Sequence, residues 1–178
     1  ENTDDNQLAN ALFSDGAAAV LVEQEARTGL NLQQEAFHCE LATQGEHDMT
    51  WKVGDLGFEM RLSSYVPEVV GSGIRNLTRS LLSKINQGFS GIDFFAIHPG
   101  GRKILETIEH ELGISKEQNK HAYDVLKKYG NMSSPTVLFV LRAIRENMNG
   151  TSNGKRILSF AFGPGLTLES MILKVVIL

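Results

Sequence analysis

The chain has 178 residues, which is enough for one domain with a sizeable core or for one half of a larger two-lobed fold. Hydrophobic residues make up 42% and charged residues 21%, which excludes a disordered chain, and the net charge of -4 argues against nucleic acid as a main partner. No apolar run approaches the roughly 20 residues that span a bilayer, no signal peptide is recognised, and the single Cys39 permits no internal disulfide, so we expect a cytoplasmic protein.

The first third of the chain predicts three strands after a polar N-terminal loop. Residues 17–22 are small and then branched, which favours a buried strand with close neighbours. Residues 34–42 alternate between two faces and predict a strand with one face buried. Residues 43–52 are polar and predict a loop, and residues 56–62 carry apolar side chains at period 2, which predicts a half-buried strand.

Four helices are predicted in the remainder. The first begins near Tyr65, and its apolar stripe has the spacing of an amphipathic helix. The stripe consists of Val70, Ile74, Leu77, Leu81 and Ile85. Residues 102–112 predict a second helix, Ser115 is the expected N-cap of a third helix that ends at Gly130, and Pro135 suits the first turn of a fourth.

Three more strands are predicted between and after these helices. Residues 92–97 form an apolar run typical of a buried strand, and residues 156–162 and 169–178 read as the last two strands. Strands therefore interleave with helices, which indicates an α/β fold with helices covering a mixed sheet. No repeat or linker divides the chain, so we expect residues 1–178 to form a single domain.

Three turns follow buried strands or helices and carry glycine or polar residues, namely residues 98–101, 130–134 and 163–165. Ligands of open α/β sheets bind at such turns. His98 and Asn131 could both donate hydrogen bonds to one carbonyl oxygen, which would stabilise an enolate or a tetrahedral oxyanion. On these observations alone, a structural role for His98 and an Asx turn or helix N-cap at Asn131 are the more common interpretations.

Four segments together resemble the chalcone and stilbene synthases, the type III polyketide synthases. Residues 94–101 (FFAIHPGG) resemble their histidine segment, and residues 129–134 (YGNMSS) resemble their asparagine segment. Residues 160–169 (FAFGPGLTLE) resemble their Gly-Phe-Gly-Pro-Gly signature, with Ala161 in place of the first glycine. Residues 12–19 (LFSDGAAA) resemble the segment that opens the second half of the family.

The resemblance implies the C-terminal lobe of a thiolase fold. It also implies decarboxylative condensation of malonyl-CoA with an acyl-CoA starter, catalysed by a Cys-His-Asn triad. His98 would be the catalytic histidine, which also pairs with the cysteine thiolate, and Asn131 would be the catalytic asparagine. Coenzyme A thioesters would be substrates, and no cofactor is expected.

The same resemblance suggests a substrate-binding set. It comprises Met60, Gly100, Gly101, Ser133, Phe162 and Gly163. Ser133 matches a cavity-lining position that influences chain length, and Phe162 a position beside the nucleophile. Met60 falls where plant members carry a phenylalanine, which leaves room for an aliphatic starter.

The nucleophilic cysteine is expected in an N-terminal half that this chain does not contain. Cys39 lies in a strand-like context, which favours a small buried core residue. We therefore expect partners in the form of acyl-CoA, malonyl-CoA and the N-terminal half, a homodimer at full length, and no condensation by this chain alone. No metal site is predicted, because the other histidines show no ligand spacing. These are His38, His47, His110 and His121.

Two alternatives remain. A 3-ketoacyl-acyl-carrier-protein synthase III also uses Cys, His and Asn, but it usually carries Gln-Ala-Asn after the histidine, so residues 99–101 (PGG) favour the polyketide synthase. A non-catalytic thiolase-like module that binds acyl-CoA is the second alternative.

Overall fold

The computed structural model describes residues 4–55 and 57–178. Four strands form one sheet in the order β1-β6-β5-β4, and β2 and β3 form a separate hairpin. The helices are α1 (Asp4–Leu12), α2 (Val66–Ser83), α3 (Arg102–Leu112), α4 (Lys120–Tyr129) and α5 (Pro135–Glu146). The strands are β1 (Leu30–Leu41), β2 (Met49–Gly54), β3 (Gly57–Leu62), β4 (Phe94–Ile97), β5 (Arg156–Gly163) and β6 (Thr167–Ile177).

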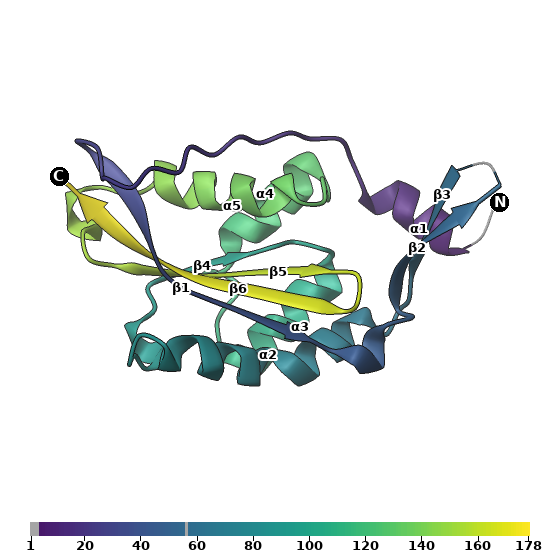
Figure 1. The fold of residues 1–178 in the computed structure, drawn as a ribbon. Coiled ribbons are helices and arrows are strands. Elements are labelled where there is room, and N and C mark those ends of the chain that lie inside the picture. The colour runs from purple at the N-terminus through teal and green to yellow at the C-terminus, as the bar shows by residue number, and fades with distance from the viewer. Residues whose placement is uncertain (1–3, 56) are drawn as a thin grey trace.

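Helices cover both faces of the four-stranded sheet, with α2 and α3 on one face and α4 and α5 on the other (Figure 1). The sheet is mixed, because β4 and β5 are parallel whereas β6 is antiparallel to both β5 and β1. This arrangement confirms the predicted α/β class with helices over a mixed sheet.

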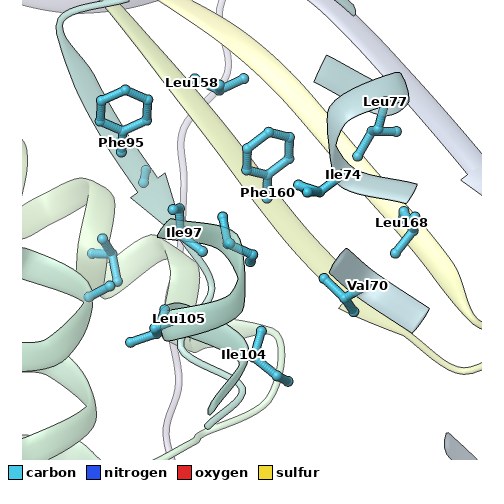
Figure 2. Packing of buried hydrophobic residues seen from close by; sticks show 14 of the residues in the cluster. Val70, Ile74, Leu77, Phe95, Ile97, Ile104, Leu105, Leu158, Phe160 and Leu168 are labelled. Carbon is cyan, nitrogen blue, oxygen red and sulfur yellow. The ribbon is translucent and has the colours of Figure 1, made fainter. Parts of the chain in front are cut away.

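The core extends over both faces of the sheet, and one part of it lies between α2 and the sheet. Four residues of the predicted stripe account for this part, since Val70, Ile74, Leu77 and Leu81 are all fully buried. Ile85, the last residue of the predicted stripe, lies beyond the end of α2 and is half-buried. Figure 2 shows the Phe160 ring of β5 beside Ile74 of this helix. Burying each such side chain contributes about 1.5–3 kcal/mol, so this contact fixes the position of α2 on the sheet.

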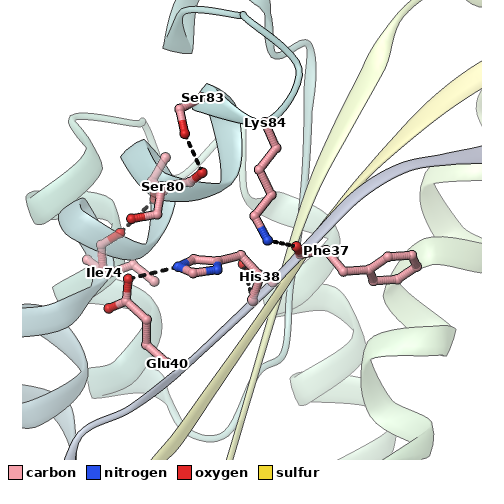
Figure 3. A network of polar contacts seen from close by, with 9 residues as sticks. Phe37, His38, Glu40, Ile74, Ser80, Ser83 and Lys84 are labelled. Carbon is pink, nitrogen blue, oxygen red and sulfur yellow. Dashed lines mark hydrogen bonds and ion pairs between the residues drawn. The ribbon is translucent and has the colours of Figure 1, made fainter.

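Polar contacts attach the edge strand β1 to its neighbours. Lys84, directly after α2, donates from Nζ to the Phe37 carbonyl oxygen at 2.6 Å, whereas the pair between His38 and Glu40 at 3.1 Å lies within β1 itself (Figure 3). Glu35, at an irregularity in β1, forms a two-bond ion pair with Arg156 of β5, at 2.7 and 3.2 Å. This pair joins β1 to β5 across β6, which lies between them.

The predicted strand at residues 17–22 is wrong. These residues are irregular and exposed, with Leu21 71% exposed, and the segment runs along the outer side of α4 and α5 (Figure 1). A strand needs neighbours for its backbone N–H and C=O groups. Within the described part of the chain, no strand lies beside this segment to provide them.

The hairpin β2–β3 corrects two further predictions. β2 occupies part of the predicted loop at residues 43–52, and β3 confirms the predicted strand except at Leu56, which lies outside the described residues. The apolar face of β3 is less buried than predicted, because β3 pairs with β2 and not with the larger sheet. Phe58 is 75% exposed, and only Leu62 is buried.

The helix boundaries are mostly as predicted. Gly113 ends α3 in the left-handed conformation, and Pro135 begins α5. The third predicted helix starts at Lys120 and not after Ser115, since residues 116–119 form a separate turn, which Ser115 and Gln118 begin with reciprocal hydrogen bonds. The N-terminal loop is also corrected, since residues 4–12 form α1.

Candidate functional site

His98 lies at the carboxyl end of β4, directly after Ile97. Its backbone N–H donates to the Phe160 carbonyl oxygen at 2.9 Å, which continues the parallel ladder between β4 and β5. The residue is only 8% exposed. Because parallel strands share one edge at their carboxyl ends, His98 and the end of β5 lie at the edge where α/β sheets commonly bind ligands.

Gly100 lies beside the imidazole ring of His98, and a side chain there would be tight only against Ile104. A Cβ at Gly100 would lie 3.7 Å from Nε2 of His98 and 3.0 Å from Cδ1 of Ile104. The Gly100 N–H donates to the His98 carbonyl oxygen at 2.9 Å and closes a tight turn before α3. Gly101, by contrast, has an extended φ of 167°, which any residue adopts.

The imidazole of His98 is neutral at neutral pH. Burial lowers the pKa of His98 to about 4, because desolvation disfavours the charged ring. Neither ring nitrogen has a hydrogen-bond partner among residues 4–55 and 57–178. The neutral ring therefore has an N–H available for a carbonyl oxygen of a bound molecule.

Asn131 is placed by the end of α4. Tyr129 is the last helical residue, and Gly130 turns the chain with a positive φ of 72°. Asn131 is 3% exposed. Its Nδ2 donates to the Gly100 carbonyl oxygen at 3.2 Å, and its Oδ1 accepts from the Ser133 N–H at 2.9 Å. The Asx-type turn is therefore present, and the same side chain joins the asparagine loop to the histidine loop.

The segment Leu12 to Gly16 belongs to this site, although sequence analysis placed no site residue there. The Asn131 N–H donates to the Leu12 carbonyl oxygen, and the Ser14 N–H donates to the Asn131 carbonyl oxygen, both at 2.9 Å. A Cβ at Gly16 would lie 2.3 Å from Sδ of Met132. Two glycines in facing segments, Gly16 and Gly130, were the available signal for this close approach.

Four family-like segments thus meet in one place. The segment after α1 contacts the asparagine loop, the asparagine loop contacts the histidine loop, and the histidine loop is bonded to β5. Phe162 and Gly163 are half-buried at the end of β5, where they pair with Leu168 and Thr167 of β6.

Other predicted residues lie elsewhere or differ from expectation. Met60 is half-buried in the hairpin β2–β3, which does not pair with the main sheet. Ser133 is exposed and adopts a positive φ of 62° at the start of α5.

Cys39 is exposed, not buried as predicted, because it lies on the same side of β1 as the exposed Phe37 and Leu41. A hydrogen bond with Glu169, and then partial burial, raise the pKa of the Cys39 thiol, which makes it a weak nucleophile at neutral pH.

In the part of the chain that the structure describes, no cluster of three or more His, Cys, Asp or Glu side chains could hold a metal ion. Across residues 4–55 and 57–178, no helix has the length and apolar character required to cross a membrane.

Most of the chain matches a known protein family. The sequence model for "Chalcone and stilbene synthases, C-terminal domain" matches residues 33–177. A probable polyketide synthase from Dictyostelium discoideum is 36% identical over 99% of this chain and 6% of that protein. The alpha-pyrone synthesis polyketide synthase-like Pks18 of Mycobacterium tuberculosis is 32% identical over 95% of this chain and 44% of that protein. The chain therefore spans less than half of these curated relatives.

Solved structures agree with this assignment. PKS-I from the brown alga Ectocarpus siliculosus has a TM-score of 0.84 and 29% identity, over 98% of this chain and 48% of that one. The C-terminal type III polyketide synthase domain of Steely1, a type I/III hybrid from Dictyostelium, has a TM-score of 0.81 and 31% identity, over 99% of this chain and 50% of that one. The chain belongs to the chalcone and stilbene synthase family and has the fold of the C-terminal half of type III polyketide synthases.

Proposed function

We propose that this chain is the C-terminal domain of an acyltransferase that condenses malonyl-CoA with an acyl-CoA starter by decarboxylation. His98 and Asn131 would hold the thioester carbonyl of malonyl-CoA, so that loss of CO2 leaves a stabilised enolate. The observation that carries the proposal is the junction of the two loops. A neutral His98 with no partner for its ring nitrogens lies beside Gly100, and Asn131 is bonded to the carbonyl of that same glycine.

The test is malonyl-CoA decarboxylation by a synthase that contains this chain as its C-terminal domain. The substitution His98→Gln should lower kcat by roughly 10²–10³-fold, the loss typical of one oxyanion donor. His110→Gln is the matched control, because the His110 side chain is 82% exposed and pairs only with Glu111. A His98→Gln enzyme that retains the wild-type rate would remove His98 from the mechanism.

The nucleophile would come from the other half of the synthase. Cys39 supports this, because it is exposed on an edge strand and its pKa is raised, whereas a nucleophilic cysteine needs a lowered pKa. The thiolate of the other half would raise the pKa of His98 and form an ion pair with it. Incubation of this chain alone with malonyl-CoA and a long acyl-CoA should give no polyketide by mass spectrometry.

The substrate-binding roles remain part of the proposal. Phe162 and Gly163, at the end of β5, lie at the same sheet edge as His98 and would form one wall of the acyl cavity. Ser133 and Met60 would line the cavity where the two halves meet. If Met60 leaves space for an aliphatic starter, Met60→Phe should lower kcat/KM for a long acyl-CoA more than for a short one, measured in parallel assays.

An apolar surface supports a contact with the other half of the protein. In the hairpin β2–β3, Trp51, Val53 and Phe58 are 55%, 84% and 75% exposed, and the Trp51 and Phe58 rings contact each other edge to face. Exposed apolar side chains gathered in this way mark interaction surfaces. We propose that this face packs against the N-terminal half.

A further inference from the structure

The helices α3 and α4 connect the two loops of the proposed site. α3 begins at Arg102, shortly after His98, and α4 ends at Tyr129, two residues before Asn131. The relative position of these helices therefore affects the relative position of the two loops, because a helix transmits displacement along its length. The contacts between α3 and α4 therefore affect the distance between the histidine loop and the asparagine loop.

One polar cluster joins α3 to α4. The Glu109 carboxylate of α3 accepts a hydrogen bond from Nδ2 of Asn119 at 2.8 Å and another from the Tyr123 hydroxyl at 3.1 Å. Nζ of Lys116 lies 4.5 Å from the centroid of the Tyr123 ring. A carboxylate can only accept hydrogen bonds, so Glu109 fixes the direction of both donors.

Asn119 is fully buried, although it directly precedes α4, where an asparagine usually caps the helix. Its side chain makes no capping bond and points to Glu109 instead. Its Oδ1 is buried without a hydrogen-bond partner. A buried amide oxygen without a hydrogen-bond partner costs free energy. An asparagine that capped the helix would avoid this desolvation cost, so the bond from Asn119 to Glu109 must offset it.

The distance from this cluster to the site makes small displacements important. Tyr123 precedes Tyr129 by six residues, which corresponds to about 9 Å of helix. A tilt of α4 by about 6° around the cluster would move the end of α4 by about 1 Å. A displacement of about 1 Å in a catalytic group can lower a rate by about 10²-fold.

We propose that Glu109, Asn119 and Tyr123 form a positioning cluster that holds Asn131 at the correct distance from His98. This inference rests on the function proposed above. None of the three residues would touch substrate. They act through α4 and the asparagine loop, together with the bonds that the Leu12 to Gly16 segment makes to that loop.

The experiment uses Tyr123→Phe and Glu109→Ala in the complete synthase. The matched controls are Tyr65→Phe and Glu146→Ala, because Tyr65 is 64% exposed and the Glu146 side chain is 55% exposed at the end of α5. Steady-state malonyl-CoA decarboxylation gives kcat and KM. A ¹³C-methyl NMR signal of Met132, which is buried beside Asn131, reports the position of the loop.

The expected result for both cluster variants is a fall in kcat of about tenfold with KM changed less than twofold, and a shifted Met132 signal. Glu109→Gln should restore most of kcat, because the glutamine oxygen can accept from the Tyr123 hydroxyl, and after a 180° rotation of the Asn119 side-chain amide the glutamine amide can donate to Asn119 Oδ1. An unchanged kcat and an unshifted Met132 signal in Tyr123→Phe would overturn the proposal.

The two proposals can fail separately. If the wild-type synthase decarboxylates no malonyl-CoA, the proposed function fails, and the Met132 signal alone decides the role of the cluster. A shift in Tyr123→Phe but not in Tyr65→Phe supports the positioning role. Equal spectra for the two variants overturn it. Should Glu109→Ala fail to fold, Tyr123→Phe, which removes only one hydroxyl, still gives the decisive measurement.

Discussion

Helix α2 and the hairpin β2–β3 are neighbours in the sequence and carry apolar residues with comparable regularity, but their surroundings differ. The stripe of α2 is fully buried against the sheet, whereas Val53 and Phe58 of the hairpin are 84% and 75% exposed. The pattern of α2 correctly predicts a helix and that of residues 56–62 correctly predicts a strand, whereas β2 occupies part of a predicted loop. Apolar periodicity therefore indicates that a face needs a cover, but it does not identify the cover or the chain segment that provides it.

The same comparison holds for residues 17–22. Their small and branched side chains suit a buried strand, but Leu21 is 71% exposed. Substitutions in the covered regions should therefore lower the free energy of unfolding more than substitutions in the uncovered ones.

The strongest test compares two phenylalanines. Phe160→Ala in β5 should lower the free energy of unfolding of this chain by about 3–5 kcal/mol, because Phe160 is 1% exposed and its removal leaves a cavity. Phe58→Ala in the hairpin should change it by less than about 0.5 kcal/mol. Urea unfolding measures both. Equal losses would show that the hairpin face is covered in solution.

Acid should destabilise the covered region through His98. The pKa of about 4 in the folded chain lies below the ordinary value of 6.5, so the unfolded chain binds more protons between these pH values. The free energy of unfolding should therefore fall as pH is lowered from 6.5 to 4, by on the order of 3 kcal/mol from this residue, and the loss should stop below pH 4. Urea unfolding of wild type and His98→Gln at several pH values isolates this contribution, and parallel pH profiles would contradict it.

Gly16→Ala tests the contact between the N-terminal segment and the asparagine loop. Gly16→Ala should destabilise the chain by about 1–3 kcal/mol, because the new Cβ would overlap Met132. Gly150→Ala is the control, since nothing lies within 4 Å of a Cβ there. If thermal unfolding gives the same Tm for both variants, the segment is not packed on the asparagine loop.

The smallest effect is expected at Cys39, on the uncovered side of β1. Cys39→Ser should change the free energy of unfolding by less than about 0.5 kcal/mol, because the side chain is exposed. The native thiol should react with a thiol reagent, and Glu169→Gln should accelerate the reaction, since Glu169 raises the pKa of Cys39. If the thiol reacts only after unfolding, Cys39 is buried, as the sequence predicts.

Much of the fold is predictable because its signals are local. The stripe of α2, the cap at Gly113 and the proline at the start of α5 each depend on neighbouring residues in the sequence. The irregular segment at residues 17–22 could not be predicted, because a strand depends on distant partners. The site divides in the same way. His98 and Asn131 are proposed from local motifs, but the bonds between Asn131 and residues 12–14 span more than a hundred residues.

The ion pair between Glu35 and Arg156 has a consequence for the alignment of β1. The pair spans β6, so it fixes the register of β1 relative to both β6 and β5. A slip of β1 by one residue would reverse which side of the sheet each of its side chains occupies. Cys39 would then turn towards α2, and His38 would turn to solvent. A single ion pair at the middle of β1 thus helps decide that the Cys39 thiol faces outward.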